Sequence, residues 1–182
     1  MKKILKNCLF VVALTILCGG VFPLALTGLA QLAMPHQANG SLIYAENVVV
    51  GSELVGQDFE GSDYFWGRPS RVAYNMDGNA SGSGSNNYSV SDPQLEQRIV
   101  NRIEGLSLVG KDNAIPTDLV TESGSGLDPH ISYESARIQV PRISQNTGIS
   151  ESELIVLIDK HTDNYKLTQV VNLNHDLYEL RK

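Results

Sequence analysis

Apolar and polar positions divide the chain into two unequal parts. Residues 7–35 carry no charged side chain, three lysines stand just before them, and the first acidic residue is Glu46. As a helix, residues 8–30 would span about 34 Å, which is enough for the hydrocarbon core of a bilayer. The pattern predicts a membrane-spanning helix over residues 8–30, in which Pro23 kinks the helix or widens one turn.

The charges beside this segment predict its orientation. Lys2, Lys3 and Lys6 lie only on its N-terminal side, and basic residues favour the cytoplasmic side of a membrane. We therefore expect residues 1–7 in the cytoplasm and residues 31–182 outside it. A cleaved signal peptide is the alternative, although the apolar run is longer than the usual signal-peptide core. Both alternatives place the remaining chain on the same side of the membrane.

The pattern after the apolar segment consists of short elements. β-Prone runs at residues 41–44 and 48–55 are broken by glycines, which predicts a hairpin. Residues 77–92 are rich in Gly, Ser and Asn and cannot bury an apolar face, so we expect a mobile loop there. Residues 119–121 are predicted as a strand.

Helix signals dominate the second half of the chain. Residues 93–106 carry an apolar stripe, begin with a proline and can be capped by Ser91 or Asp92. A second helix is expected from Ser132 to about residue 146, although Pro141 removes one of its backbone hydrogen bonds.

The last part of the chain combines a clear signal with an ambiguous one. Ser150 and Glu153 form a capping box before another apolar stripe. Residues 170–171 read as a strand, whereas the leucines of residues 173–180 suit a terminal helix. These mixed elements predict a small α+β domain after one transmembrane helix.

Composition narrows the range of functions. The formal net charge is −6, and without the three leading lysines it is −9, which argues against nucleic acid and anionic lipid as partners. Cys8 and Cys18 are the only cysteines, so the domain has no disulfide, thiolate nucleophile or cysteine metal site. The four histidines have no partner at ligand spacing, and no metal site is predicted.

Residues 123–132 (SGSGLDPHIS), here called the 123–132 block, hold the densest group of reactive residue types. A hydrolase would use Ser125, Asp128 and His130, but a catalytic triad brings its members from separate elements. The glycines could instead present backbone amides to an anion. The simpler interpretation is a tight loop in which Asp128 and His130 hydrogen-bond locally before Ser132 caps a helix.

Two further motifs need a choice between interpretations. Residues 105–111 (GLSLVGK) match the first part of a phosphate-binding P-loop, but a helix precedes them and Asp112 replaces the required hydroxyl residue. We interpret them as a helix end.

Residues 64–69 (YFWGRP) concentrate aromatic rings beside Arg68. They suit core packing with Arg68 paired to a carboxylate, or a partner-facing hot spot, and we expect a mixture.

Eight short segments of the chain match, in the same order, segments of one known protein family. The chain resembles the C subunits of Kdp-type, high-affinity potassium-transporting P-type ATPases, the KdpC family, over nearly its whole length, and the 123–132 block is the most specific part. The matching blocks are residues 24–31, 38–43, 51–57, 64–70, 116–121, 123–132, 139–142 and 171–173.

The resemblance implies a non-catalytic subunit of a complex in the bacterial inner membrane that hydrolyses ATP to import potassium. Its partners would be a channel-like, potassium-translocating subunit and a phosphorylated catalytic subunit. The family's C subunit is described as a catalytic chaperone that raises the ATP affinity of the catalytic subunit. No tightly bound cofactor is implied, and ATP would be shared with the catalytic subunit.

Roles for particular residues follow from two sources: the residue types give the partner interface, and the resemblance gives the residues linked to nucleotide. A partner interface is expected at Tyr64, Phe65, Trp66 and Arg68. Catalytic and metal-binding residues are expected to be absent. The residues linked to nucleotide are Gln139, Ser123, Gly124, Ser125, Gly126, Asp128 and His130.

A purely structural subunit is the rival hypothesis. Its outer domain would cover the ion entrance of the channel-like subunit and would not contact nucleotide. The predicted topology argues against direct contact between Gln139 and ATP, because it places Gln139 across the membrane from cytoplasmic ATP.

Overall fold

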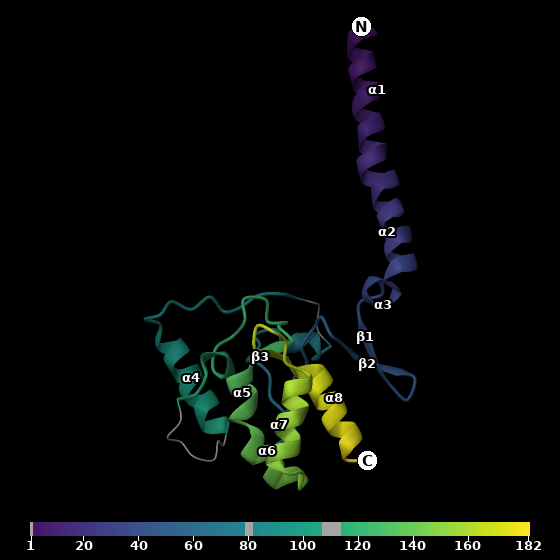
Figure 1. Cartoon of the computed structure of the whole chain (residues 1–182). Helices are drawn as coiled ribbons and strands as arrows, with labels where there is room; N and C mark the ends of the chain where they lie inside the picture. The colour runs from purple at the N-terminus through teal and green to yellow at the C-terminus, as the bar shows by residue number, and fades with distance from the viewer. Residues whose placement is uncertain (1, 79–81, 107–113) are drawn as a thin grey trace. The chain divides into compact units, whose positions relative to one another are not determined.

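The computed structural model describes residues 2–78, 82–106 and 114–182. The chain divides into two units, Met1–Leu42 and Ile43–Lys182. Figure 1 shows the first unit as a long helix and the second as short helices, short strands and connecting loops. All the candidate site residues belong to the second unit.

One run of helix makes up most of the first unit. α1 (Lys2–Ile16) continues through a π-helical turn, η1 (Leu17–Val21), into α2 (Phe22–Ala33), and α3 (Pro35–Ala38) follows. The 32 residues from Lys2 to Ala33 are long and apolar enough to cross a membrane. Pro23 has no N–H for the ordinary helical bond, and the wider turn directly before α2 accommodates its ring. The wider turn predicted at Pro23 is therefore present.

A hairpin begins at the boundary between the two units. β1 (Leu42–Ala45) and β2 (Val48–Ser52) form a two-stranded sheet. The two residues between them, Glu46 and Asn47, have φ angles of 49° and 65°, and such left-handed pairs make the tight turns that match the twist of paired strands. The predicted hairpin is confirmed.

Four helices and a second small sheet form the C-terminal half. The helices are α5 (Tyr133–Arg137), α6 (Val140–Thr147), α7 (Glu151–Lys160) and α8 (Val170–Leu180). β3 (His130–Ser132) runs antiparallel to β4 (Leu167–Gln169). Apolar side chains from these elements bury one another around Phe65: Ile131, Ala136, Val140, Ile143, Leu154, Leu157, Ile158, Val170, Leu173 and Leu177.

The predicted helix starts in this half are confirmed, but two predicted elements change form. Ser132 caps α5 and the Ser150 capping box opens α7. Pro141 divides the single helix predicted after Ser132, because it lies in the first turn of a new helix, α6. The strand option for residues 170–171 is wrong, because the Gln169 side chain accepts a hydrogen bond from Asn172 N at 2.6 Å and starts α8 there.

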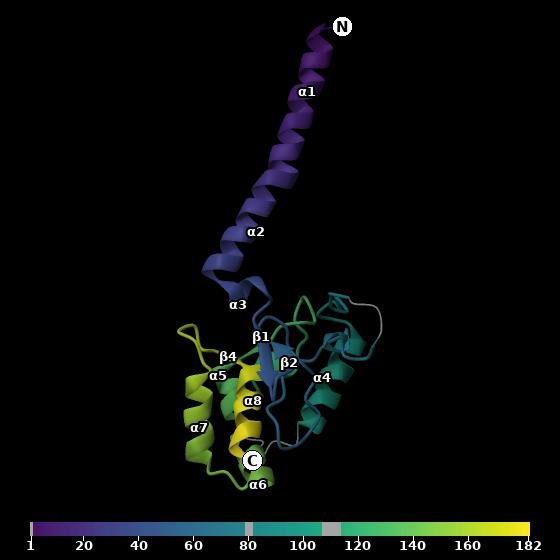
Figure 2. The same cartoon turned by 90° about the vertical axis from the view of Figure 1, so that its right-hand side faces the viewer.

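α4 (Pro93–Gly105) lies on the opposite side of the second unit from α7, as Figures 1 and 2 show. Asp92 caps it, as predicted, and it ends at Gly105, so the rest of the P-loop look-alike, 107–111, lies outside the described residues. The strand predicted at 119–121 is wrong. Hydrogen bonds from Leu119 N and Thr121 N to carbonyls just upstream close a 3-10 turn, η3 (Thr117–Leu119), instead.

Loops connect α4 to the rest of the unit. The mobile loop predicted at residues 77–92 stays a prediction, since its residues 79–81 lie outside the described ranges. Its later part is bonded: Gly84 N donates to Ser125 O at 2.7 Å, and Asn86 N to the Glu122 carboxylate at 3.0 Å. Together with the helices and strands described above, these loops make the second unit a mixed α+β fold, as the sequence predicts.

Candidate functional site

The 123–132 block folds as a loop that uses its own polar groups. Ser123 Oγ accepts from Gly126 N at 2.9 Å, Ser125 Oγ from Leu127 N at 3.1 Å, and Asp128 Oδ1 from His130 N at 3.0 Å. Each of these amides would otherwise be available to an anion. The loop therefore hydrogen-bonds internally, as the local interpretation of Asp128 and His130 predicts.

Glycine is required inside the block at one position. Gly126 has a φ of +69°, and a Cβ there would lie 2.8 Å from Val72 Cγ2 and 2.9 Å from Gly84 O. Gly124 has open space instead. The loop thus meets two other loop segments so closely at Gly126 that no larger residue fits.

Arg68 and Asp128 form the ion pair at the centre of this region. Arg68 Nη1 lies 3.1 Å from Asp128 Oδ2, while Nη2 donates to Glu122 O at 2.9 Å. Burial alone would raise the pKa of Asp128, but hydrogen bonds from His130 and Arg68 outweigh burial and hold this pKa below its ordinary value of 3.8. The carboxylate therefore stays ionised as a structural anchor for Arg68.

Ser125, Asp128 and His130 lie in one loop but do not form a triad. His130 Nδ1 is 3.6 Å from Asp128 Oδ1. The described contacts of Ser125 Oγ are with Leu127 N and, at 3.5 Å, with Ser123 Oγ, and none is with His130. A nucleophile needs a base within hydrogen-bond reach. This geometry does not provide the hydrolase arrangement.

Residues 68–75 wrap around the block in an unusual backbone conformation. η2 (Ala73–Asn75) has φ angles of 46°, 51° and 58°, the left-handed region that non-glycine residues rarely adopt. The buried Tyr74 donates its hydroxyl proton to Arg68 O at 2.7 Å, and burial raises the pKa of Tyr74 to about 12. A protonated Tyr74 thus holds Arg68 in place.

Gln139 is completely buried and all of its side-chain hydrogen-bonding groups are engaged. Its Oε1 accepts from Trp66 N at 2.8 Å and Arg142 Nη2 at 2.7 Å, and its Nε2 donates to Trp66 O at 3.1 Å and Ser135 O at 3.0 Å. The amide therefore pairs with both backbone groups of Trp66. An amide bound in this way has no group left for a nucleotide.

Arg142 bonds to Gln139 and stacks on the indole ring of Trp66. Its Cζ lies 4.0 Å from the Trp66 ring centroid, and Nη2 also donates to Tyr64 O at 3.0 Å. Its Nε is buried and has no hydrogen-bond partner among the described residues. Burial lowers the pKa of Arg142 to about 10. The stacked arginine thus holds the backbone of residues 64–66 against α6.

The predicted interface residues divide between the core and the surface. Phe65 is completely buried, and Asn174 pairs with both of its backbone groups at 2.8 Å. Tyr64 and Trp66 are half-buried, with Arg181 over the first ring and Arg102 as a second arginine over the indole. The core-packing part of the predicted mixture is present, and Arg68 has its carboxylate.

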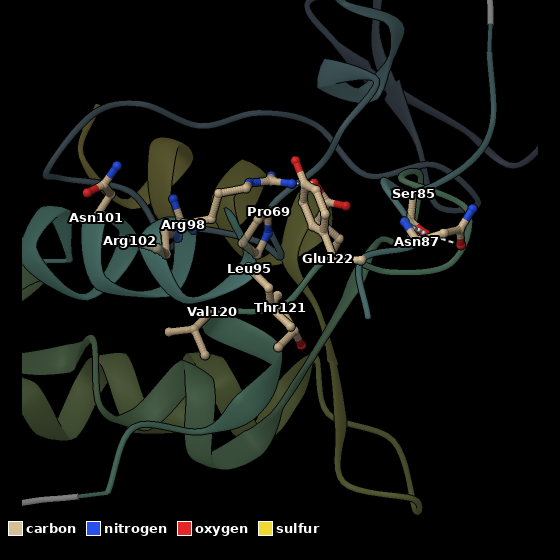
Figure 3. Close-up of a pocket in the computed structure, with 11 residues that line it drawn as sticks. Pro69, Ser85, Asn87, Leu95, Arg98, Asn101, Arg102, Val120, Thr121 and Glu122 are labelled. Carbon is tan, nitrogen blue, oxygen red and sulfur yellow. Dashed lines mark hydrogen bonds and ion pairs between the residues drawn. The ribbon is translucent and has the colours of Figure 1, made fainter. Parts of the chain in front are cut away.

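A pocket of about 480 Å³ lies beside these residues, between α4 and the segment that leads into the block (Figure 3). Arg98 on α4 forms an ion pair with Glu122 and lies over the Tyr88 ring, 5.7 Å from its centroid. Both carboxylate oxygens of Glu122 also accept hydrogen bonds from Asn86. Glu122 therefore matches the charge of Arg98, whereas Arg102, which also lines the pocket, donates to the carbonyl oxygens of Leu119 and Gly67.

Sequence patterns miss the residues that join these segments. Asn174, Tyr74, Glu122 and Arg142 all bond to residues at least six positions away, and only three-dimensional contact reveals them. The pairing of His161 is also not visible in the sequence, because its Nε2 lies 2.9 Å from Oδ2 of Asp176, which is fifteen positions away. Within the described ranges, no three His, Cys, Asp or Glu side chains gather closely enough to hold a metal ion.

Fold and site together define a membrane protein with a single N-terminal span and a small α+β domain whose polar side chains fasten loops. Residues 4–178 match the family described as "K+-transporting ATPase, c chain". The chain belongs to this family and is a component of the potassium-transporting ATPase complex.

Relatives from several bacteria agree with this assignment. The "Potassium-transporting ATPase KdpC subunit" of Geobacter sulfurreducens is 44% identical, with 92% of this chain and 88% of the relative aligned. That of Clostridioides difficile is 46% identical over 88% and 86%. That of Bacillus cereus is 44% identical over 92% and 90%. The match thus covers both the apolar helix and the α+β domain.

Proposed function

We propose that this chain is a non-catalytic subunit that stabilises the potassium import complex and raises the ATP affinity of its phosphorylated catalytic subunit indirectly. One observation carries the indirect mechanism: Gln139 and the amides of the 123–132 block are already bonded within the domain. These residues shape the domain. Their effect on nucleotide passes through the contacts that this shape makes with other subunits.

The charge pattern supports an outer location for the domain in the bacterial inner membrane. Three lysines precede the apolar helix and none follows it before Lys111, so residues 1–7 face the cytoplasm. ATP is then on the opposite side from residues 31–182. Coupling to ATP has to travel through the membrane helix and the packed helices of the channel-like and catalytic subunits.

The complex with and without this chain tests the effect on ATP. We expect the KM for ATP of potassium-stimulated hydrolysis to rise when the chain is omitted, and a photoreactive ATP analogue to label the catalytic subunit and not this chain. Labelling of this chain would contradict the indirect mechanism. An unchanged KM with reduced potassium transport would favour the rival function, in which the acidic domain covers the ion entrance.

A cysteine on the domain tests the orientation separately. Val90 is 98% exposed, so Val90→Cys, with Cys8 and Cys18 replaced by serine, offers one reactive thiol. We expect a membrane-impermeant maleimide to label this thiol when it is added to intact right-side-out vesicles, whose exposed face is the extracytoplasmic one. Labelling only after the vesicles are permeabilised would overturn the proposed topology.

A further inference from the structure

A groove of about 610 Å³ is lined by residues of the β1–β2 hairpin, of residues 57–59 and of α8, and Tyr64 also lines it. Figure 2 shows the backbone of the hairpin and of α8. We call this groove the hairpin groove. Its walls are mostly apolar, and charged side chains stand at its rim. The lining residues that matter here are Val48, Val50, Asp58, Met76, Tyr178 and Lys182.

The hairpin side of the groove is unusually apolar for an exposed surface. Val48, Val49 and Val50 follow one another along β2 and are 63%, 50% and 40% exposed. Because successive strand residues point to opposite faces, exposed valines lie on both faces of this strand. Met76 and Tyr178 extend the same surface and are also exposed. Contiguous apolar surface of this kind marks an interaction site.

Side chains, and not strand pairing, provide this interaction. The Gln57 side chain donates to Val50 O at 2.6 Å and so occupies one hydrogen-bonding group of β2. A Cβ on Gly51 would lie 2.9 Å from Gln57 Nε2 and 3.1 Å from Val171 Cγ1, so α8 and Gln57 press closely on the strand. An added strand would need free backbone groups along this edge.

The charges at the rim indicate what chemistry the occupant has. Lys182 Nζ donates to both Glu46 at 3.1 Å and Glu179 at 3.0 Å. The Asp58 carboxylate is exposed and has no hydrogen-bond or ion-pair partner in the described part of the chain. Among the charged residues that line the groove, the two carboxylates of Glu46 and Asp58 stand against one ammonium, that of Lys182, which leaves an excess of negative charge. An occupant with a lysine or arginine complements this rim, and anionic lipid headgroups do not.

Chain length limits the distance between the hairpin and the apolar helix. Residues 34–41 connect α2 to β1, and eight residues cannot extend beyond about 28 Å. β1 therefore begins no farther than this from the end of the apolar helix. In the assembled complex of the proposed function, segments of other subunits that leave the membrane beside this helix are the occupants within reach of the hairpin.

We propose that the hairpin groove docks an extramembrane segment of another subunit of the complex, with apolar side chains against Val48–Val50 and a basic side chain facing Asp58. This inference rests on the proposed function, because it requires the chain to act within the assembled complex. It locates a contact surface that includes Tyr64 but neither Trp66 nor Arg68.

Photo-crosslinking in membranes tests the occupant. A photoreactive amino acid replaces Val48 in the full-length chain and, as the matched control, the exposed Val90. We expect irradiation of the assembled complex to join the Val48 variant, and not the Val90 variant, to another subunit. An adduct with lipid alone, an adduct with a second copy of this chain, or no adduct in an assembled complex would overturn the proposal.

Charge reversal tests the chemistry of the rim. Asp58→Lys should reduce co-purification of the other subunits about tenfold, and the reduction should shrink at high salt. Glu104→Lys, at an exposed position on α4, makes the same change in net charge and should have no effect. Equal co-purification of both variants would refute the proposed basic contact. If the unmodified chain does not co-purify with other subunits, the proposed function fails instead.

Discussion

The second unit contains two halves that are stabilised in different ways. Residues 130–180 form short helices with side-chain caps around a shared apolar core. Residues 46–128 contain much less regular structure, and bonds between distant side chains and backbone groups fasten them. Local sequence thus determines residues 130–180, here called the helical half, while residues 46–128, the loop half, depend on contacts between positions far apart in the sequence.

Two buried amides join the halves. Gln139 at the start of α6 pairs with the backbone of Trp66, and Asn174 on α8 pairs with the backbone of Phe65. Each amide replaces the hydrogen bonds that a neighbouring strand would supply. Gln139 and Asn174 therefore attach the loops to the helical half. Gln139 is also one of the residues that the family resemblance links to nucleotide.

Gln139→Leu should have the largest effect, because it breaks this junction while keeping the side chain's approximate size. Trp66 N–H and the Arg142 guanidinium would stay buried without their acceptor, so we expect a loss of about 3–5 kcal/mol in the free energy of unfolding. Urea unfolding of the full-length chain in detergent measures it. Gln94→Leu, at an exposed position on α4, is the control and should change little.

The same variant separates shape from nucleotide contact. If Gln139 acts only through shape, Gln139→Leu should raise the KM for ATP of the complex in proportion to the fraction of domain that is unfolded. A large rise in KM with unchanged stability would mean that Gln139 does more than hold Trp66.

Arg68→Met tests the centre of the loop half. It removes the ion pair with Asp128 and a hydrogen bond to Glu122 O, and we expect a loss of about 2–3 kcal/mol. The pKa of Asp128 is held below 3.8 in the folded chain, so its contribution is present above that pH and is lost as the pH falls through the folded value. Without Arg68 this pKa rises, and acid unfolding should begin at a higher pH.

Acid unfolding of both chains, followed from about pH 7 down to about pH 2, measures this shift. Arg71→Met is the control, since Arg71 is exposed and no ion pair of it is described. Identical acid transitions in the wild-type and Arg68→Met chains would show that Asp128 does not depend on Arg68.

The contrast between the halves also explains what the sequence predicts. The apolar span, the hairpin, and the caps at Asp92, Ser132 and Ser150 follow from local rules, and the structure has all of them. The errors at residues 119–121 and 170–171 arose from β-branched residues. Their strand preference yields to the turn bonds of Thr117 and to the Gln169 cap.

The site was less predictable for a related reason. The local bonds of Asp128 and His130 follow from their spacing. The carboxylate that pairs with Arg68 lies sixty positions away, and the amide that binds Trp66 lies seventy-three away. Nothing in local spacing encodes such pairings. The hairpin groove was also missed, because its walls come from separate segments.

Ser150→Ala tests the helical half. Ser150 Oγ accepts from Glu153 N and the Glu153 side chain bonds back to Ser150 N, and losing such a cap costs about 1 kcal/mol. We expect that smaller loss, with the loop half intact, because the core of the helical half remains. Thermal unfolding of the full-length chain measures it, with Gln145→Ala, at an exposed position on α6, as the control. A loss as large as that of Gln139→Leu would contradict the distinction between the halves.

Ala73→Gly should have the smallest effect and the opposite sign. Ala73 has a φ of 46°, where a Cβ is unfavourable and glycine is not. Glycine at this position should raise the free energy of unfolding by about 0.5–1 kcal/mol, because relief of the strain exceeds the entropy lost on folding. The melting temperature of the full-length chain measures it. Ala136→Gly, inside α5 at a buried position with ordinary helical geometry, should destabilise instead. If both variants destabilise, the left-handed turn around Tyr74 holds no relievable strain, and the loop half is less strained than its backbone angles indicate.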